Sequence, residues 1–160
     1  MTEQDATFED GREAPLYLAA MDGEDLKILS ALTQDAVFPI TEMRWQPRTR
    51  RFALLINRFR WEDLPAAERR GRKPERVQSL LVVDNVLKAA SQGFDRSDKD
   101  LILSLLAVTF EPGEDGTGGV LLTLAGDGAV RLSVEALEVT VKDVTRPYVA
   151  PSGKAPDHPL

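Results

Sequence analysis

Residues 51–61, RFALLINRFRW, form the densest strand-like run in the chain and most limit what it can fold into. Phe52, Leu54 and Ile56 recur with the period of two that places side chains on one face of a strand. Aromatic residues, which favour strands, continue the run to Trp61. We therefore expect a long strand here that packs one face on a hydrophobic core.

The preceding segment is expected to pair with this strand as a hairpin. Residues 40–46 alternate in polarity, and residues 47–50, PRTR, place a proline where it presets the backbone of a turn. Two alternating runs joined by such a short turn are typical of a β-hairpin. The expected core-facing side chains of its first strand are Thr41, Met43 and Trp45.

The N-terminal part predicts one strand and one helix. Residues 16–21 are a short apolar run, expected to be a strand. Asp22 then has the properties of an N-cap, and Asp25 suits the positive end of a helix dipole. Leucines and an isoleucine share one face over residues 24–33, which predicts an amphipathic helix.

Residues 62–76, EDLPAAERRGRKPER, have no apolar periodicity and are expected to form a long exposed loop. Residues 77–87 predict a strand with a bulge or turn at Asp84-Asn85. Residues 91–100 are expected to be a loop. The apolar run 101–110 fits either a helix or a strand, and we favour a helical turn after Ser97 followed by a strand over about 105–111.

The C-terminal third predicts further hairpins. Residues 112–119, PGEDGTGG, and the tight turn 126–128 flank an expected strand at 120–125. Residues 129–141 are expected to be one long strand. Their alternation shifts by one residue, which predicts a bulge near Ala136-Leu137.

These elements predict an α+β domain over residues 15–145. Its mainly antiparallel sheet would have about seven strands, with a barrel-like closure as one alternative, and one or two short helices. A tail at 1–14 and another at 146–160 are expected to be disordered and flexible. Residues 22–32 resemble 96–106, so an internal duplication with halves 15–62 and 77–145, joined by loop 63–76, is a second hypothesis.

Composition excludes several classes of protein. The 160 residues contain no cysteine, which rules out disulfides and thiolate metal sites. No apolar run is long enough to cross a membrane, and the N-terminus lacks the pattern of a signal peptide. We expect a cytoplasmic protein without a membrane partner.

The sequence gives little support for catalysis, a metal or a cofactor. Its only histidine, His158, lies in the proline-rich tail, where nothing rigid would position a base. The acids near residues 22–25 and 95–100 are more typical of helix starts than of a cation site. The glycines at 113–119 lack the lysine and hydroxyl residue of a phosphate-binding loop.

The clearest irregularity is a basic band within an acidic chain. Residues 44–76 contain 11 basic and 4 acidic side chains, although the chain has a net charge of −6. Arginine geometry suits phosphate and carboxylate groups, and the nearby tryptophans offer stacking surfaces. The alternative is that these arginines pair with acids of the same protein. The candidate anion- or partner-binding residues are Arg44, Arg58, Arg60, Arg69, Arg70, Arg72 and Arg76.

Four stretches carry a family resemblance: LKILSALTQDAVFPI, RRFALLINRFRWE, GFDRSDKDLILSLLAVTFEPG and GGVLLTLAGDGAVRLSVEALEV. Over about residues 15–145 they resemble a family of short bacterial proteins, mostly alphaproteobacterial, described only as a domain of unknown function. The resemblance implies a bacterial cytoplasmic protein and carries no activity, cofactor or site residue.

We therefore expect a non-catalytic binding or adaptor module whose basic hairpin and loop engage an acidic protein, a nucleotide or RNA. A homodimer that associates through strand edges is the alternative. An enzyme that acts on a small anionic substrate is the least favoured reading.

Overall fold

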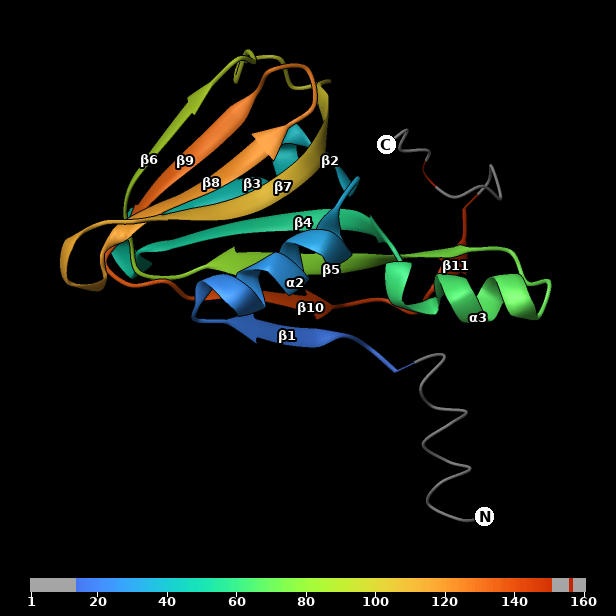
Figure 1. Ribbon diagram of the computed structural model, residues 1–160. Coiled ribbons are helices and arrows are strands. Elements are labelled where there is room, and N and C mark those ends of the chain that lie inside the picture. Colours follow the sequence, from blue (N-terminus) through green and yellow to red (C-terminus); the bar gives the residue numbers. More distant parts are fainter. Residues whose placement is uncertain (1–13, 151–155, 157–160) are drawn as a thin grey trace.

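The computed structural model describes residues 14–150 and residue 156 (Figure 1). His158 and most of the two predicted tails lie outside the described residues. Within the described part, one sheet of 11 strands is accompanied by two short α-helices, and every strand ladder is antiparallel. The predicted α+β class with a mainly antiparallel sheet is confirmed, but the predicted count of about seven strands is too low.

The strands follow the order β1-β10-β5-β4-β2-β7-β8-β9-β6, with β11 paired to β5 and β3 paired to β4. Their bounds are β1 Tyr17–Ala20, β2 Val37–Pro39, β3 Met43–Gln46, β4 Arg51–Phe59, β5 Glu75–Val83, β6 Val86–Gln92, β7 Ile102–Pro112, β8 Gly118–Leu124, β9 Ala129–Val134, β10 Val139–Asp143 and β11 Tyr148–Val149. The helices are α2 Gly23–Thr33 and α3 Leu64–Arg69.

The sheet bends into two layers that converge at the left of Figure 1 and diverge toward the right. One layer contains β1, β10, β5 and β4, and the other contains β7, β8, β9 and β6. Buried side chains from both layers and from α2 form one hydrophobic cluster, which includes Leu29, Leu54, Leu105 and Leu132. The sheet is open, since no ladder joins β3 to β6 anywhere in the described ranges, and barrel closure is not observed.

The chain crosses between the layers twice at the same corner. The turn after β5 contains Asn85 with φ 62°, a left-handed conformation that asparagine tolerates. The second crossing, residues 135–138, lies against it: Glu135 N donates to Asn85 O at 2.9 Å and Asp84 N donates to Glu138 O at 3.0 Å. Residues 129–141 are therefore two strands in different layers. The shift in alternation marks this crossover and not the predicted bulge.

Several local predictions are confirmed. Asp22 caps α2, because its Oδ1 accepts a 2.8 Å hydrogen bond from Asp25 N. β3 and β4 form the predicted hairpin, with Phe52, Leu54 and Ile56 buried, but residues 40–42 form a 3-10 helix and the predicted core residue Thr41 is exposed. The tight turn at 126–128 joins β8 to β9.

Other local predictions differ from the structure. Residues 62–76 contain α3 and the start of β5, because Ala67 and the ion pairs of Asp63 fix them to the domain. Residues 101–106 form no helical turn, since β7 already pairs with β2 from Ile102. The two stretches whose sequences resemble one another therefore differ in structure, since residues 23–33 form α2 and residues 102–112 form β7. Within the predicted C-terminal tail, Tyr148 and Val149 form β11 against β5.

Candidate functional site

The predicted arginine site does not form one surface. Arg58, expected on a solvent-facing strand surface, is fully buried in β4. Its guanidinium bonds Asp143 through Nε and Nη2, both at 3.0 Å, and Glu62 through Nη1 and Nη2, at 2.9 and 2.7 Å. Ser79 Oγ and Phe59 O accept the remaining bonds. Every N–H of this side chain is directed to an acceptor within the same subunit.

Arg60 and Arg72 belong to a second ion-pair cluster. Arg60 is only 2% exposed, and its Nη1 lies 2.8 Å from Glu75 Oε1. Arg72 Nη1 lies 3.0 Å from Asp63 Oδ2, and this hydrogen-bonded carboxylate raises the pKa of Arg72 above its ordinary value. These two side chains hold η3, residues Trp61–Asp63, and α3 against the start of β5.

The other four candidates lie in different places. Arg76 donates to Asn57 O at 3.3 Å and lies over the Phe59 ring at 6.0 Å. Arg69 and Arg70 are exposed at the end of α3. Arg44, on β3, borders a pocket that sequence reasoning did not anticipate. Of the seven predicted residues, Arg44 alone contributes to that pocket.

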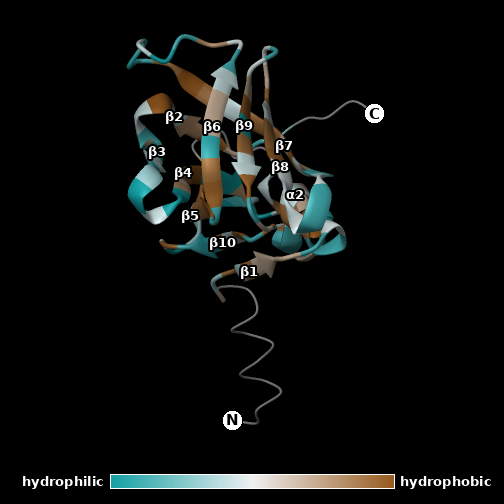
Figure 2. Ribbon diagram, turned by 90° about the vertical axis from the view of Figure 1, so that its left-hand side faces the viewer, coloured by the Kyte–Doolittle hydropathy of each residue, from teal (hydrophilic) through white to brown (hydrophobic). Residues whose placement is uncertain are grey.

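The pocket is a cleft between β3 and β6, which lie next to one another on the face shown in Figure 2. Each of these strands pairs on one side only, β3 with β4 and β6 with β9. At the corner of the sheet the turn that follows β3 is joined to the start of β6 by a 2.8 Å hydrogen bond from Val86 N to Arg50 O. Away from this bond the two strands separate and leave a cavity of about 400 Å³.

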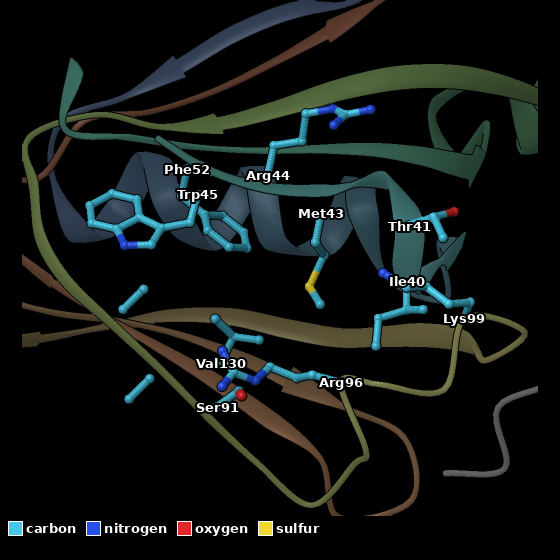
Figure 3. Close-up of a pocket in the computed structure, with 12 residues that line it drawn as sticks. Ile40, Thr41, Met43, Arg44, Trp45, Phe52, Ser91, Arg96, Lys99 and Val130 are labelled. Atoms are coloured by element: carbon cyan, nitrogen blue, oxygen red, sulfur yellow. The ribbon is translucent and has the colours of Figure 1, made fainter. Parts of the chain in front are cut away.

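The floor of the cleft is apolar. Phe52 and Val130 lie at its base with only 5% and 3% of their surface exposed. Figure 3 shows Met43 and Ile40 directed toward Val130 across the opening, with the Trp45 ring at one end. On β6 the lining residues are small, Ala89, Ala90 and Ser91, and their size leaves the space open. A cavity of this size with an apolar base matches the usual dimensions of a ligand site.

Three cations border the cleft. Figure 3 shows Arg96 reaching from the loop after β6 toward Val130 and Ser91, and Lys99 beyond Ile40. Arg44 also lines the cleft, but its side chain extends from β3 away from Val130, on the side opposite to Met43. All three are exposed, and none forms an ion pair with any residue that the structure describes. The residues that line the cleft include no carboxylate. The result is an apolar cavity with a positive rim.

Two acids of the loop that carries Arg96 and Lys99 accept hydrogen bonds within that loop. Asp95 Oδ1 accepts bonds from Ser97 Oγ at 2.6 Å and Ser97 N at 2.9 Å, and these bonds lower the pKa of Asp95 below its ordinary value. Asp98 Oδ1 accepts from Asp100 N at 3.1 Å. Both carboxylates stabilise the turn that presents Arg96 and Lys99.

Sequence reasoning missed Arg96 and Lys99 because residues 91–100 have no periodicity, and their composition predicts a loop without pointing to a site. The one available signal was a pair of basic residues within a stretch rich in aspartate and serine, which is typical of a capped turn. In the described part of the chain, no three His, Asp or Glu side chains gather closely enough to hold a metal ion.

Comparison with known protein families gives one match. The family model described as Protein of unknown function (DUF2948) matches residues 16–158. The chain belongs to this family. Searches of curated proteins and of solved structures gave no significant match for this DUF2948 protein. None of its described helices is both long and apolar enough to cross a membrane.

Proposed function

We propose that this DUF2948 protein is a non-catalytic binding module that engages an anionic partner at the cleft between β3 and β6. One observation carries the proposal: Arg44, Arg96 and Lys99 border an apolar cavity of about 400 Å³ whose lining contains no carboxylate. An anion that also carries an apolar group could pair with the cations of the rim and pack on the apolar floor.

Charge distribution supports the choice of this cleft over the rest of the basic band. Arg58, Arg60 and Arg72 already bond carboxylates of their own subunit, at distances of 2.7 to 3.0 Å. Releasing such a buried arginine would leave its acid uncompensated, which is costly. The cations at the cleft form no ion pair with the described residues, so no such pair must be broken before they bind an anionic partner.

The test is a titration followed by amide chemical shifts, with three anionic probes: a glutamate-rich peptide, ATP and a short uridine oligonucleotide. We expect at least one probe to shift the signals of Trp45, Ser91 and Arg96 in a saturable manner. The apparent affinity should fall as salt is raised, because salt screens exposed charges.

A matched pair of variants assigns the effect to the cleft. The cleft variant Arg44→Gln/Arg96→Gln/Lys99→Gln should lose about tenfold in affinity, since each exposed charge contact contributes about 0.2–1 kcal/mol. The control Lys27→Gln/Arg69→Gln/Lys73→Gln removes the same formal charge from exposed positions on other parts of the fold and should bind as the wild type does. Equal losses in both variants, or no shifts with any probe, would contradict the proposal.

A further inference from the structure

We infer that the anionic partner is an extended acidic peptide that adds as a strand to the free edge of β6. This inference rests on the proposed function and names its partner. It depends on three features of β6: the direction of its backbone groups, the hollows on both of its faces, and the charges around it.

Hydrogen bonds at the two ends of β9 establish which backbone groups of β6 are free. Glu135 N donates to Asn85 O on the β6 side, and Gly128 O accepts from Leu124 N on the β8 side. Because the direction of the backbone N–H and C=O groups alternates along a strand, these groups of Arg131 and Ser133 point toward β6. Their partners in the register are Ala90 and Lys88. The amides and carbonyls of Ala89 and Ser91 therefore point away from β9, toward the cleft.

This part of the edge lacks the features that normally prevent pairing. Edges are usually blocked by bulges, charges or proline. β6 has its register shift between Val86 and Lys88, at the end already closed by the bond to Arg50. From Ala89 to Gln92 its sequence is AASQ, with no charge and no proline. The unprotected segment is the one that borders the cleft.

Hollows lie on both faces of the same segment. The cleft occupies the inner face beside Ala89 and Ser91. A second hollow of about 240 Å³ lies beside Ala90, Gln92 and Leu121. Side chains of an added strand alternate between the two faces of the sheet. On the inner face they would enter the cleft, and on the outer face they would lie beside Ala90 and Gln92, where the second hollow begins and extends over β9 and β8. This matches the recognition mode in which backbone bonds give affinity and alternate pockets give selectivity.

Charge favours an acidic peptide over a second copy of this chain. Lys88, Arg96 and Lys99 are all exposed near this edge. If two copies paired through β6, these cations would face one another, and like charges that lie opposite across strands are destabilising. Aspartate or glutamate in the peptide would instead compensate them.

The test begins with selection of random peptides displayed on phage against the wild-type protein, followed by synthesis of the enriched peptides. We expect acidic sequences with alternating apolar residues. Two versions of each peptide are then compared, one N-methylated at the odd-numbered residues and one at the even-numbered residues. Only one of the two should lose binding, because alternate amides of an added strand face β6. In hydrogen exchange, the bound peptide should protect the amides of Ala89 and Ser91.

A matched pair of variants isolates the backbone contribution. Ser91→Pro deletes one amide that faces the cleft without removing a bond to β9, and it should lose about tenfold or more in affinity. Ser91→Ala keeps the amide and should bind as the wild type does. Should Ser91→Pro fail to fold, methylated peptides and hydrogen exchange on the wild type decide the question.

The outcomes separate this inference from the function on which it rests. Failure to enrich peptides, or enriched peptides that ignore backbone methylation and leave Ala89 and Ser91 unprotected, would overturn strand addition. Binding of ATP or the oligonucleotide at the cleft in that case would leave the anion-binding function intact. If the protein is a dimer on sizing chromatography and Ser91→Pro converts it to a monomer, β6 pairs with a second copy. This result would also overturn the inference of a peptide partner.

Discussion

Arg58 and Asp143, 85 residues apart in the chain, form a two-point ion pair in which Nε and Nη2 each lie 3.0 Å from a different carboxylate oxygen. Arg58 is on β4 and Asp143 ends β10, and Ser79 on the intervening strand β5 donates its hydroxyl to Asp143 at 2.6 Å. Leu16 N donates to the other oxygen at 2.8 Å. The pair therefore ties three adjacent strands and the chain entering β1 together at one end of the layer.

The first prediction concerns loss of one partner of this pair. Asp143→Asn should lower the free energy of unfolding by about 3–5 kcal/mol, because it leaves the buried guanidinium of Arg58 without its buried counter-charge and with Glu62 alone. Urea denaturation gives the measurement. The double variant Arg58→Met/Asp143→Leu should lose less unfolding free energy than Arg58→Met and Asp143→Leu lose in sum. The remaining partner, Glu62, is 30% exposed and can return to water. Additive losses would show that the two residues act independently.

Acid should weaken the same contact. Burial would raise the pKa of Asp143, but hydrogen bonds from Arg58, Ser79 and the Leu16 amide outweigh it and hold the pKa below the ordinary value of 3.8. A carboxylate with a lowered pKa stabilises the fold fully above its unfolded pKa and loses this effect as pH falls through the folded one. We expect the difference in unfolding free energy between wild type and Asp143→Asn to be constant near neutral pH and to shrink below about pH 4. A difference that persists unchanged into stronger acid would contradict this assignment.

Substitution by alanine should have opposite effects on stability at two glycines. A Cβ at Gly118 would lie 2.4 Å from Glu111 O and 2.6 Å from the Phe110 ring, so Gly118→Ala should cost about 1–3 kcal/mol. At Gly23, in the first turn of α2, no atom lies within 4 Å of the added Cβ. Gly23→Ala should therefore stabilise the protein by about 0.4–1 kcal/mol. Thermal unfolding of both variants gives the comparison, and a destabilised Gly23→Ala would show that this position needs glycine for another reason.

Trp45 should report on occupation of the cleft. It lies at one end of the cavity, whereas Trp61 is held elsewhere by a 2.9 Å bond from its Nε1 to Gln34 O. Trp61→Phe leaves Trp45 as the sole indole, and Trp45→Phe leaves Trp61. An anionic partner should change the fluorescence of Trp61→Phe and of the wild type but not that of Trp45→Phe. A response confined to Trp61 would place the partner outside the cleft.

The same residues show where sequence reasoning was insufficient. Arg58 and Arg60 are candidate anion-binding residues in the sequence because guanidinium geometry suits phosphate and carboxylate, with pairing to acids of the same protein as the alternative. Each arginine has one partner nearby in the sequence, Glu62 for Arg58 and Asp63 for Arg60. The second partners, Asp143 and Glu75, come from other strands and are not revealed by a local pattern. The bulge predicted from the one-residue shift near Ala136 is wrong, because a bulge and a crossover between layers give the same pattern.

The sequence by itself determined the elements whose signal is local: the capped helix α2, the β3–β4 hairpin, the turn at 126–128 and the antiparallel character of the sheet. Capping, turn geometry and alternation act between residues a few positions apart, so one stretch of chain contains the whole signal. Only the tertiary structure decided which arginines are buried and that β3 and β6 stay apart to form a cleft bordered by Arg44, Arg96 and Lys99. These features arise from packing between segments distant in sequence, where burial energy and ion pairing override local preference.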